Sequence, residues 1–332
     1  MVEKNQDPRG GEDVPHLTGV YLGHKLDLPA MFDHLLGPGV TLRRPEGIAR
    51  PEEIRLALCW HPEPDAFDAF PNLELAMSIG AGVETLLTHP RLPARVRVAR
   101  VRDPHQAQQM AGYVAHEILH DAREFPRMAA NAAARHWQFL PLRPPVETIV
   151  AVLGHGTMGR AVAEALRVLG FSLRVACRRA PDDPLPGVDY VTGQGAVARA
   201  ATGAHVLVNV LPLTEETRDV LDADLFARLA RGARLIQIGR GAHLVERDLI
   251  AALDAGQLSG ATLDVFRQEP LPADHPFWGD ARLRITPHVA SDSTPAVVAA
   301  QITAMARALA VSGADALPGP LADLLVDRGR GY

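Results

Sequence analysis

The chain has 332 residues, of which 47% are hydrophobic and 22% charged, and its formal net charge is −5. A single hydrophobic core rarely grows beyond about 250–300 residues, so this length predicts two domains. The composition is typical of a soluble globular protein, and the small negative charge argues against a nucleic-acid partner, which would require a basic face.

The cysteine content and the N-terminal residues bear on location. Cys59 and Cys177 provide no disulfide framework, which favours a reducing compartment. Residues 1–15, MVEKNQDPRGGEDVP, lack the apolar stretch of a secretory signal and are interpreted as a mobile tail. No apolar run approaches the length of about 18 residues that a membrane span needs. We therefore expect a cytoplasmic protein with no membrane partner.

Residues 1–105 are predicted to form a first, smaller α/β domain. Short apolar runs with strand character occur at residues 19–22, 54–60, 73–79 and 96–101, and a helix is expected over residues 30–36. A glycine-rich loop, SIGAGVE at residues 78–84, directly follows one of these strands. Its backbone amides could bind a small anion, although such loops are more often plain turns.

Residues 104–137 carry many Ala, Gln, Met and Leu residues and predict one or two helices. Apolar side chains recur there at helical spacing, at Met110, Val114, Ile118 and Leu119. This face is assigned to the core or to a subunit interface. Three nearby histidines lack a convincing set of companion ligands, so no metal site is predicted at His116, His120 and His136. Prolines at residues 141–145 indicate a linker.

The stretch after this linker has the pattern of a dinucleotide-binding βαβ unit. An apolar strand at residues 148–153 precedes a helix and a second strand at residues 172–176. Glycines lie between the first strand and the helix, at Gly154, Gly156 and Gly159. They would allow a tight turn, close approach of the backbone to a pyrophosphate, and packing of the helix on the sheet. Helix N-terminal amides, at Thr157 and Met158, would bind the phosphates.

The end of the second strand indicates which dinucleotide is bound. An acidic residue there would bind the ribose 2′-hydroxyl of NAD, whereas arginine accommodates the 2′-phosphate of NADP. The chain has Arg178 and Arg179 at this point, and the first acidic residues are Asp182 and Asp183. Guanidinium groups can pair with a phosphate, so NADP(H) is favoured and NAD(H) stays open. The alternative is that both arginines are merely solvated surface residues.

Strands and helices continue to alternate downstream. Strands are expected at residues 205–211, 234–238, 261–266 and 283–286, with helices at 222–229, 246–255 and 294–311. This order predicts a Rossmann-type, doubly wound parallel sheet in a dinucleotide-binding domain of residues 106–292. Residues 293–332 are expected to return to the first domain.

Ionisable residues follow the strands of the second domain, where ligands bind in such sheets. They are Arg240, Asp264, Glu269 and His288. An arginine can bind a substrate carboxylate and polarise the adjacent carbonyl. A histidine can give a proton to the alkoxide that forms when hydride arrives, and a neighbouring carboxylate raises the pKa of that histidine. Arg240, Glu269 and His288 are therefore interpreted as the catalytic set for hydride transfer.

Several ordered motifs resemble those of one enzyme family. They are LGHGTMG (153–159), LPLTEETR (211–218), IGRGAHLVERDLIAAL (238–253), LDVFRQEPLP (263–272) and ITPHVA (285–290). Together they resemble the D-isomer-specific 2-hydroxyacid dehydrogenases. Three further motifs are similar to those of the glyoxylate/hydroxypyruvate reductase A type within that family, namely CWHP (59–62), SIGAGVE (78–84) and RHWQFLP (135–141).

The resemblance implies a reaction and a role for each motif. Glyoxylate or hydroxypyruvate would be reduced to the 2-hydroxy acid, with His288 as acid/base, Glu269 tuning it and Arg240 binding substrate. The backbone of Ala81, Gly82 and Val83 would receive the substrate carboxylate, and Trp60 would form a pocket wall. On the cofactor side the resemblance implies contacts from Leu211, Pro212 and Asp264.

The resemblance also implies an architecture. The smaller domain would be flavodoxin-like, the subunits would form a homodimer through their nucleotide domains around Met110–Leu119, and the two domains would close with hinges near Pro104 and residues 291–294. Three residues depart from the family pattern: Glu84, Gln237 and Gly239. Two other functions stay open, a dehydrogenase for a bulkier 2-oxo acid and a non-catalytic protein that senses a dinucleotide.

Overall fold

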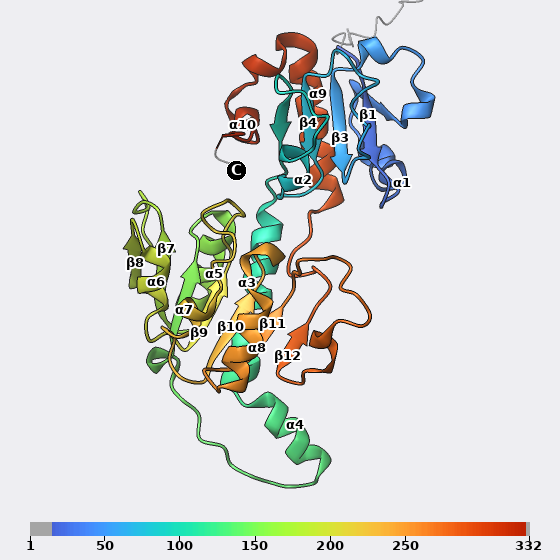
Figure 1. The fold of residues 1–332 in the computed structure, drawn as a ribbon. Coiled ribbons are helices and arrows are strands. Elements are labelled where there is room, and N and C mark those ends of the chain that lie inside the picture. The colour runs from blue at the N-terminus through green and yellow to red at the C-terminus, as the bar shows by residue number, and fades with distance from the viewer. Residues whose placement is uncertain (1–14, 330–332) are drawn as a thin grey trace, which may run out of the picture. The chain divides into compact units, whose positions relative to one another are not determined.

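The computed structural model describes residues 15–329; the predicted N-terminal tail lies outside this range except for Pro15. The chain divides into two compact units, Met1–Asp103 with Ser293–Tyr332, and Pro104–Asp292 (Figure 1). Each unit has a parallel β-sheet with helices on its faces. The predicted α/β fold class with two sheets is therefore confirmed.

The first unit contains, within residues 15–329, a five-stranded parallel sheet in the order β2-β1-β3-β4-β5. The strands are β1 Leu17–Gly23, β2 Val40–Arg43, β3 Leu56–Trp60, β4 Leu75–Ser78 and β5 Arg97–Ala99. This is the flavodoxin-like order, as predicted. The edge strand β2 was not predicted, because its four residues carry too short a pattern to stand out. The helices of the first unit are α1 Leu28–Phe32, α2 Glu84–Leu87, α9 Pro295–Ser312 and α10 Gly319–Ala322.

Helix α9 is long and apolar enough to cross a membrane, which corrects the expectation that no run approaches this length. One side of the helix is buried inside the first unit, where Val298, Ile302 and Leu309 pack in the same core as α1 and the sheet, while Val311 is 72% exposed. The helix is thus a core element of its unit, and its composition reflects burial against protein.

The second unit contains, in the described residues, a seven-stranded parallel sheet in the order β12-β11-β10-β9-β6-β7-β8. Its strands are β6 Ile149–Leu153, β7 Ser172–Cys177, β8 Val188–Thr192, β9 Val206–Asn209, β10 Ala233–Gln237, β11 Leu258–Leu263 and β12 Leu283–Ile285. The first six in chain order have the Rossmann arrangement, and β12 extends it. Strand β8 was missed because it lies at the sheet edge and is only partly buried.

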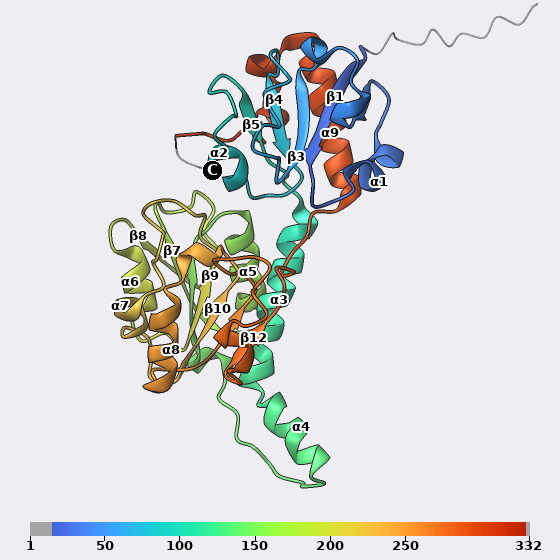
Figure 2. The same cartoon turned by 45° about the vertical axis from the view of Figure 1, so that its right-hand side comes forward.

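Helices cover both faces of this second sheet (Figure 2). They are α3 Pro104–Ala122, α4 Phe125–Ala133, α5 Thr157–Val168, α6 Ala196–Ala201, α7 Ala223–Phe226 and α8 Glu246–Asp254. Short 3₁₀ turns complete the chain at η1 Asp33–Leu35, η2 Pro45–Gly47, η3 Pro51–Glu53, η4 Pro145–Glu147, η5 Gly241–His243, η6 Pro276–Gly279 and η7 Ala314–Ala316.

The apolar face of α3 packs inside the second unit. Val114 and Ile118 are buried in one core cluster with residues of α5 and of the sheet, and Met110 and Leu119 pack against that cluster. Of the two assignments considered for this face, the core is correct for Val114 and Ile118, and a subunit interface around Met110–Leu119 stays a prediction. Two large apolar side chains further along the chain are highly exposed. Trp137 is 101% exposed and Phe139 86%, beyond α4, which extends away from the rest of its unit (Figures 1 and 2).

Candidate active site

The turn from β6 into α5 requires glycine at two positions. Gly154 has a φ of +105°, which side chains rarely adopt. A Cβ atom on Gly159 would lie 2.1 Å from the carbonyl oxygen of Gly154, so the helix can approach the strand this closely only without a side chain. Both glycines shape the loop itself, as the sequence pattern predicted.

Gly156 is different, because the fold does not require it to be glycine. Its φ is an ordinary −82°, and a Cβ there would meet none of the described atoms within 4 Å. Gly156 is the N-cap of α5 and has no side chain to cover the first turn, where Thr157 is exposed and Met158 half-buried. This open backbone at the positive end of a 12-residue helix fits a pyrophosphate group.

The residues after β7 also fit a nucleotide phosphate. Arg178 and Arg179 follow the strand directly and are exposed. Asp183, one of the first acidic residues beyond them, pairs with Arg160 of α5 at 2.7 Å (Oδ2 to Nη2). Asp183 is therefore paired with α5, and the residues that directly follow the strand are arginines and not acidic residues.

A buried polar network joins the loops after β9 and β10. Asn209, Gln237 and His243 are fully buried. The amide nitrogen of Asn209 donates to Oε1 of Gln237 at 2.7 Å and lies 2.9 Å from Nδ1 of His243. The oxygen of Asn209 accepts from the backbone of Leu211. The segment predicted to contact the cofactor, Leu211 and Pro212, is thereby tied to the Arg240 loop.

The hydrogen bonds of His243 define its tautomer. Its Nδ1 also accepts from the backbone amide of Arg240 at 3.1 Å. An atom that accepts from a backbone N–H carries no proton, so the neutral ring has its proton on Nε2 and donates it to the carbonyl of Pro212 at 3.3 Å. Gln237 completes this support by donating to the carbonyl of Arg240 at 2.7 Å. The backbone of Arg240 is therefore held on both sides.

Two departures from the family pattern fit together in this network. Gly239 lies so close to it that a Cβ would stand 2.9 Å from both Asn209 Nδ2 and His243 Nδ1. The side chain of Gln237 is longer than the Asn common in the family, and the absence of a side chain at Gly239 leaves room for the crowded network around it. The guanidinium of Arg240 is half-buried and donates to the carbonyl of Gly239 at 2.7 Å.

His288 and Glu269 form a hydrogen-bonded ion pair. Nδ1 of His288 lies 2.8 Å from Oε2 of Glu269, and the other carboxylate oxygen accepts from the backbone amide of Phe266 at 2.9 Å. The side chain of His288 is 46% exposed and that of Glu269 36%. Because an ionised carboxylate only accepts, Nδ1 carries the proton toward Glu269 and Nε2 is the nitrogen that can exchange a proton with a substrate.

Asp264 holds the segment that carries His288. Its carboxylate accepts from the Thr286 hydroxyl at 2.6 Å and from the backbone amides of Val289 and Ala290 at 2.8 and 2.9 Å. The side chain is 1% exposed. These contacts give Asp264 a role in fixing the His288 loop; contact with a cofactor stays a prediction.

The predicted substrate loop of the first unit, residues 78–84, is held by hydrogen bonds with the side chain of Ser78. The hydroxyl of Ser78 donates to the carbonyl of Gly82 at 2.8 Å and accepts from the amide of Gly80 at 3.2 Å. Ala81 and Gly82 are half-buried, whereas Val83 is buried. The ring of Trp60 lies over Gly80, 3.3 Å from where a Cβ would stand. Trp60 and the loop are therefore neighbours within this unit.

Arg240, Asp264 and His288 follow three adjacent strands, β10, β11 and β12. Parallel strands bring their carboxyl ends to one edge, so Arg240 and His288 of the predicted catalytic set are collected there with Asp264, and Glu269 joins them through its hydrogen bond to His288. In the described residues no group of three or more His, Cys, Asp or Glu side chains could hold a metal ion.

Comparison with known proteins agrees with this arrangement. Residues 115–290 match the family described as D-isomer specific 2-hydroxyacid dehydrogenase, NAD binding domain. A glyoxylate/hydroxypyruvate reductase A from Klebsiella pneumoniae is 36% identical over 305 residues, which cover 89% of this chain and 93% of that relative. The chain belongs to the D-isomer-specific 2-hydroxyacid dehydrogenases.

Solved structures of the same family superpose on the chain. A D-isomer specific 2-hydroxyacid dehydrogenase from Xanthobacter autotrophicus Py2, in complex with NADPH and MES, has a TM-score of 0.84 at 35% identity and covers 96% of this chain and 100% of its own. An NADPH-dependent glyoxylate/hydroxypyruvate reductase from Sinorhizobium meliloti, in complex with NADP and sulfate, has a TM-score of 0.82 at 30% identity and covers 95% and 100%.

The ion pair of this dehydrogenase shifts the pKa values of both partners. The hydrogen bond to Glu269 raises the pKa of His288 above its ordinary value, and outweighs burial and the nearby Arg240, which act in the opposite direction. Burial opposes ionisation of Glu269, but the hydrogen bonds from His288 and the Phe266 amide prevail and lower its pKa. His288 is thus kept protonated to a higher pH than a free histidine.

Sequence reasoning missed the residues that support the predicted catalytic set. Asn209 and His243 were not singled out, although Asn209 is the last residue of a strand at the ligand-binding edge and His243 lies in the same motif as Arg240. Polar residues at such positions in a buried strand or turn are a usable signal, because burial must be compensated by hydrogen bonds.

Glu269→Gln should lower the pKa of His288, because the substitution removes the negative charge that favours the imidazolium form and leaves only a neutral acceptor. Histidine NMR of the purified protein, with His288 assigned by its disappearance in a His288→Gln variant, measures this directly. Glu246→Gln is a matched control, since Glu246 lies 3.5 Å from another histidine, His275. A wild-type pKa at or below 6.5, the ordinary value, would contradict the geometry.

Proposed function

We propose that this dehydrogenase reduces a small 2-oxo acid, glyoxylate or hydroxypyruvate, to the 2-hydroxy acid, with NADPH preferred over NADH. The observation that carries the proposal is the His288–Glu269 pair at 2.8 Å, which stands at the same sheet edge as Arg240. A protonated histidine beside an arginine suits a substrate that has a carboxylate next to a carbonyl. The Klebsiella and Sinorhizobium relatives, both named glyoxylate/hydroxypyruvate reductases, support the same substrate class.

In the proposed reaction, NADPH supplies a hydride to the substrate's carbonyl carbon when bound. Arg240 pairs with the substrate carboxylate and orients the carbonyl, and the Nε2 proton of His288 passes to the carbonyl oxygen. Glu269 stabilises the imidazolium before this transfer. The products are the 2-hydroxy acid and NADP⁺, and His288 then regains a proton from solvent.

The cofactor preference rests on Arg178 and Arg179 together with the open backbone at Gly156. Both arginines are exposed at the end of β7, where an NADP 2′-phosphate would lie in a Rossmann sheet. NADPH and NADP in the Xanthobacter and Sinorhizobium structures support this preference. NAD(H) stays a weaker alternative, since the glycine loop serves both cofactors.

The first unit is proposed to be the substrate-binding domain. Backbone amides of the loop at Ala81, Gly82 and Val83 would receive the substrate carboxylate, with Trp60 as a pocket wall. The two segments that connect the units, near Pro104 and Ser291, would act as hinges when the enzyme closes over the substrate. Closure would exclude water from the reaction. Both cysteines are free in the described structure, which fits the cytoplasm as the proposed location.

The enzyme is further proposed to act as a homodimer. Trp137 and Phe139 are 101% and 86% exposed, in a segment next to α4, where Phe125 and Met128 are also exposed. Exposed aromatic residues in such density are typical of protein interfaces. A second copy of the chain would cover this segment, in addition to the face of α3 around Met110–Leu119.

Purified protein should oxidise NADPH when given glyoxylate or hydroxypyruvate. The measurement is the decrease in absorbance of the reduced cofactor. The rate should be full below the raised pKa of His288 and fall as the pH rises through it, because reduction consumes the imidazolium proton. His288→Gln should lower kcat by about 10²–10⁴-fold, whereas His34→Gln, at an exposed histidine of the other unit, should not. Activity restricted to bulkier 2-oxo acids would redefine the substrate, and inactivity with every acid and both cofactors would contradict an enzymatic role.

The double variant Arg178→Gln, Arg179→Gln should have a KM for NADPH raised by about tenfold or more. Its KM for NADH should be nearly unchanged, because only NADPH carries the 2′-phosphate. The same double replacement at Arg43 and Arg50, which are exposed in the other unit, controls for the change in net charge. Equal effects on the two cofactors would show that the arginines are solvated surface residues.

Sedimentation velocity at micromolar concentration should give twice the mass of the chain. A Trp137→Ser, Phe139→Ser variant should sediment as a monomer, because it lacks the most exposed apolar area of the segment. Replacement of Val168, 73% exposed on α5, by serine should leave the mass unchanged. A monomeric wild-type protein would rule out the dimer.

A further inference from the structure

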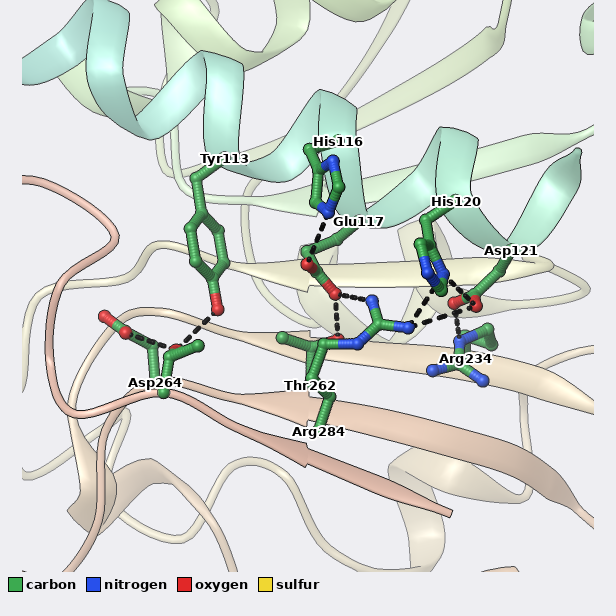
Figure 3. A network of polar contacts seen from close by, with 10 residues as sticks. Tyr113, His116, Glu117, His120, Asp121, Arg234, Thr262, Asp264 and Arg284 are labelled. Atoms are coloured by element: carbon green, nitrogen blue, oxygen red, sulfur yellow. Dashed lines mark hydrogen bonds and ion pairs between the residues drawn. The ribbon is translucent and has the colours of Figure 1, made fainter. Parts of the chain in front are cut away.

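Tyr113 of α3 reaches the segment that carries His288. Its hydroxyl lies 2.6 Å from Oγ1 of Thr286, and Thr286 in turn donates to the Asp264 carboxylate at 2.6 Å. Figure 3 shows the ring of Tyr113 pointing from the helix toward Asp264, with the two contacts drawn as consecutive dashed lines. Tyr113 lies 173 positions from Thr286 in the sequence, and no motif connects them.

The direction of these hydrogen bonds follows from the available protons. Thr286 has one hydroxyl proton, and the Asp264 carboxylate accepts it. The oxygen of Thr286 must then accept from Tyr113, so the phenol is the donor. Burial raises the pKa of Tyr113 to about 12, which keeps this proton in place at neutral pH. Tyr113 therefore donates to Thr286, and Thr286 donates to Asp264.

Asp264, the last acceptor in this series of hydrogen bonds, restrains His288. The backbone carbonyl of Asp264 accepts from the His288 amide at 2.8 Å, and its carboxylate accepts from the amides of Val289 and Ala290. His288 has a φ of +58°, a left-handed conformation that is uncommon for residues with side chains. Such a conformation persists only when surrounding contacts fix it.

Tyr113 is itself held firmly. One helical turn further along α3, buried Glu117 forms an ion pair with Arg284 of β12 and accepts from the Thr262 hydroxyl of β11 at 2.6 Å. Asp121 pairs with Arg234 of β10. Figure 3 shows these residues on the same face of the helix as Tyr113. The helix is thereby fastened to the three strands that precede Arg240, Asp264 and His288.

We propose that Tyr113 is a positioning residue for catalysis, which sets the orientation of His288 toward Glu269 through Thr286 and Asp264. The inference rests on the proposed role of His288 as acid. Without the phenol hydroxyl, Thr286 loses its donor and the loop its restraint, so the His288–Glu269 hydrogen bond is made less often. The charged groups acting on His288 are Glu269, Arg240 and Asp264; those acting on Tyr113 are Asp264, Glu117 and Arg284.

Tyr113→Phe tests this inference, because it removes one oxygen and keeps the ring. We expect kcat for 2-oxo acid reduction to fall about 5- to 20-fold, with KM for NADPH changed less than about twofold. The pH at which reduction is half lost should move to lower pH, and histidine NMR of the protein without ligands should show a lower pKa for His288. Tyr21→Phe, which removes a buried hydroxyl bonded to Asp33 in the other unit, should change none of these.

Thr286 variants test the route. Thr286→Val should reproduce the effects of Tyr113→Phe, Thr286→Ser should restore the wild-type pH profile, and the double variant Tyr113→Phe, Thr286→Val should be no worse than either single variant. Additive effects in the double variant would overturn the route. If Tyr113→Phe does not fold, the comparison of Thr286→Val with Thr286→Ser decides the same point.

The outcomes separate this inference from the proposed function. A wild-type protein that is inactive with every 2-oxo acid would refute the proposed function, and the NMR titration would still decide whether Tyr113 acts on His288. An active wild-type protein whose Tyr113→Phe variant keeps the same pH midpoint and the same His288 pKa would overturn the inference. A lower thermal stability without a pH shift would likewise assign Tyr113 a merely structural role.

Discussion

The parallel direction of the strands is the constraint on which the site depends. In the described part of the second unit, each strand pair runs parallel, so the chain must cross back after every strand and the loops that follow the strands meet at one edge. Arg240, Asp264 and His288 are distant in sequence but follow neighbouring strands. The sheet brings their loops together before any side-chain contact is considered.

Parallel strands place the loops but do not orient the side chains within them. Buried polar groups do this: His243, with its proton on Nε2, fixes the Arg240 backbone, and Asp264 fixes the His288 segment. Buried groups of this kind must be fully hydrogen-bonded or they destabilise the fold. The same requirement that stabilises the unit therefore holds Arg240 and His288 in one geometry, and the contact of Tyr113 with Thr286 joins this network to α3.

Prediction from the sequence succeeded where information is local. Gly154 and Gly159, which shape the nucleotide loop, lie in one short contiguous motif. Arg240 and His288 also lie in short motifs, and their catalytic roles are proposals. Most strands were found from their apolar runs, because strands of a parallel sheet are buried on both faces. Edge strands β2 and β8 were missed for the complementary reason: the first is short and the second only partly buried, so neither has the expected pattern.

The sequence by itself determined the family and the Rossmann order of elements, and it singled out Arg240, Glu269 and His288, whose catalytic roles are proposals. Tertiary structure alone decided what supports them. Helical periodicity shows that one side of α3 is buried, but not which strand residues it meets, so the contact of Tyr113 with Thr286 and the role of α3 in the core could not be foreseen. Hydrogen-bond partners across a helix and a sheet depend on register and distance in space, and these are properties of packing, which no local pattern encodes.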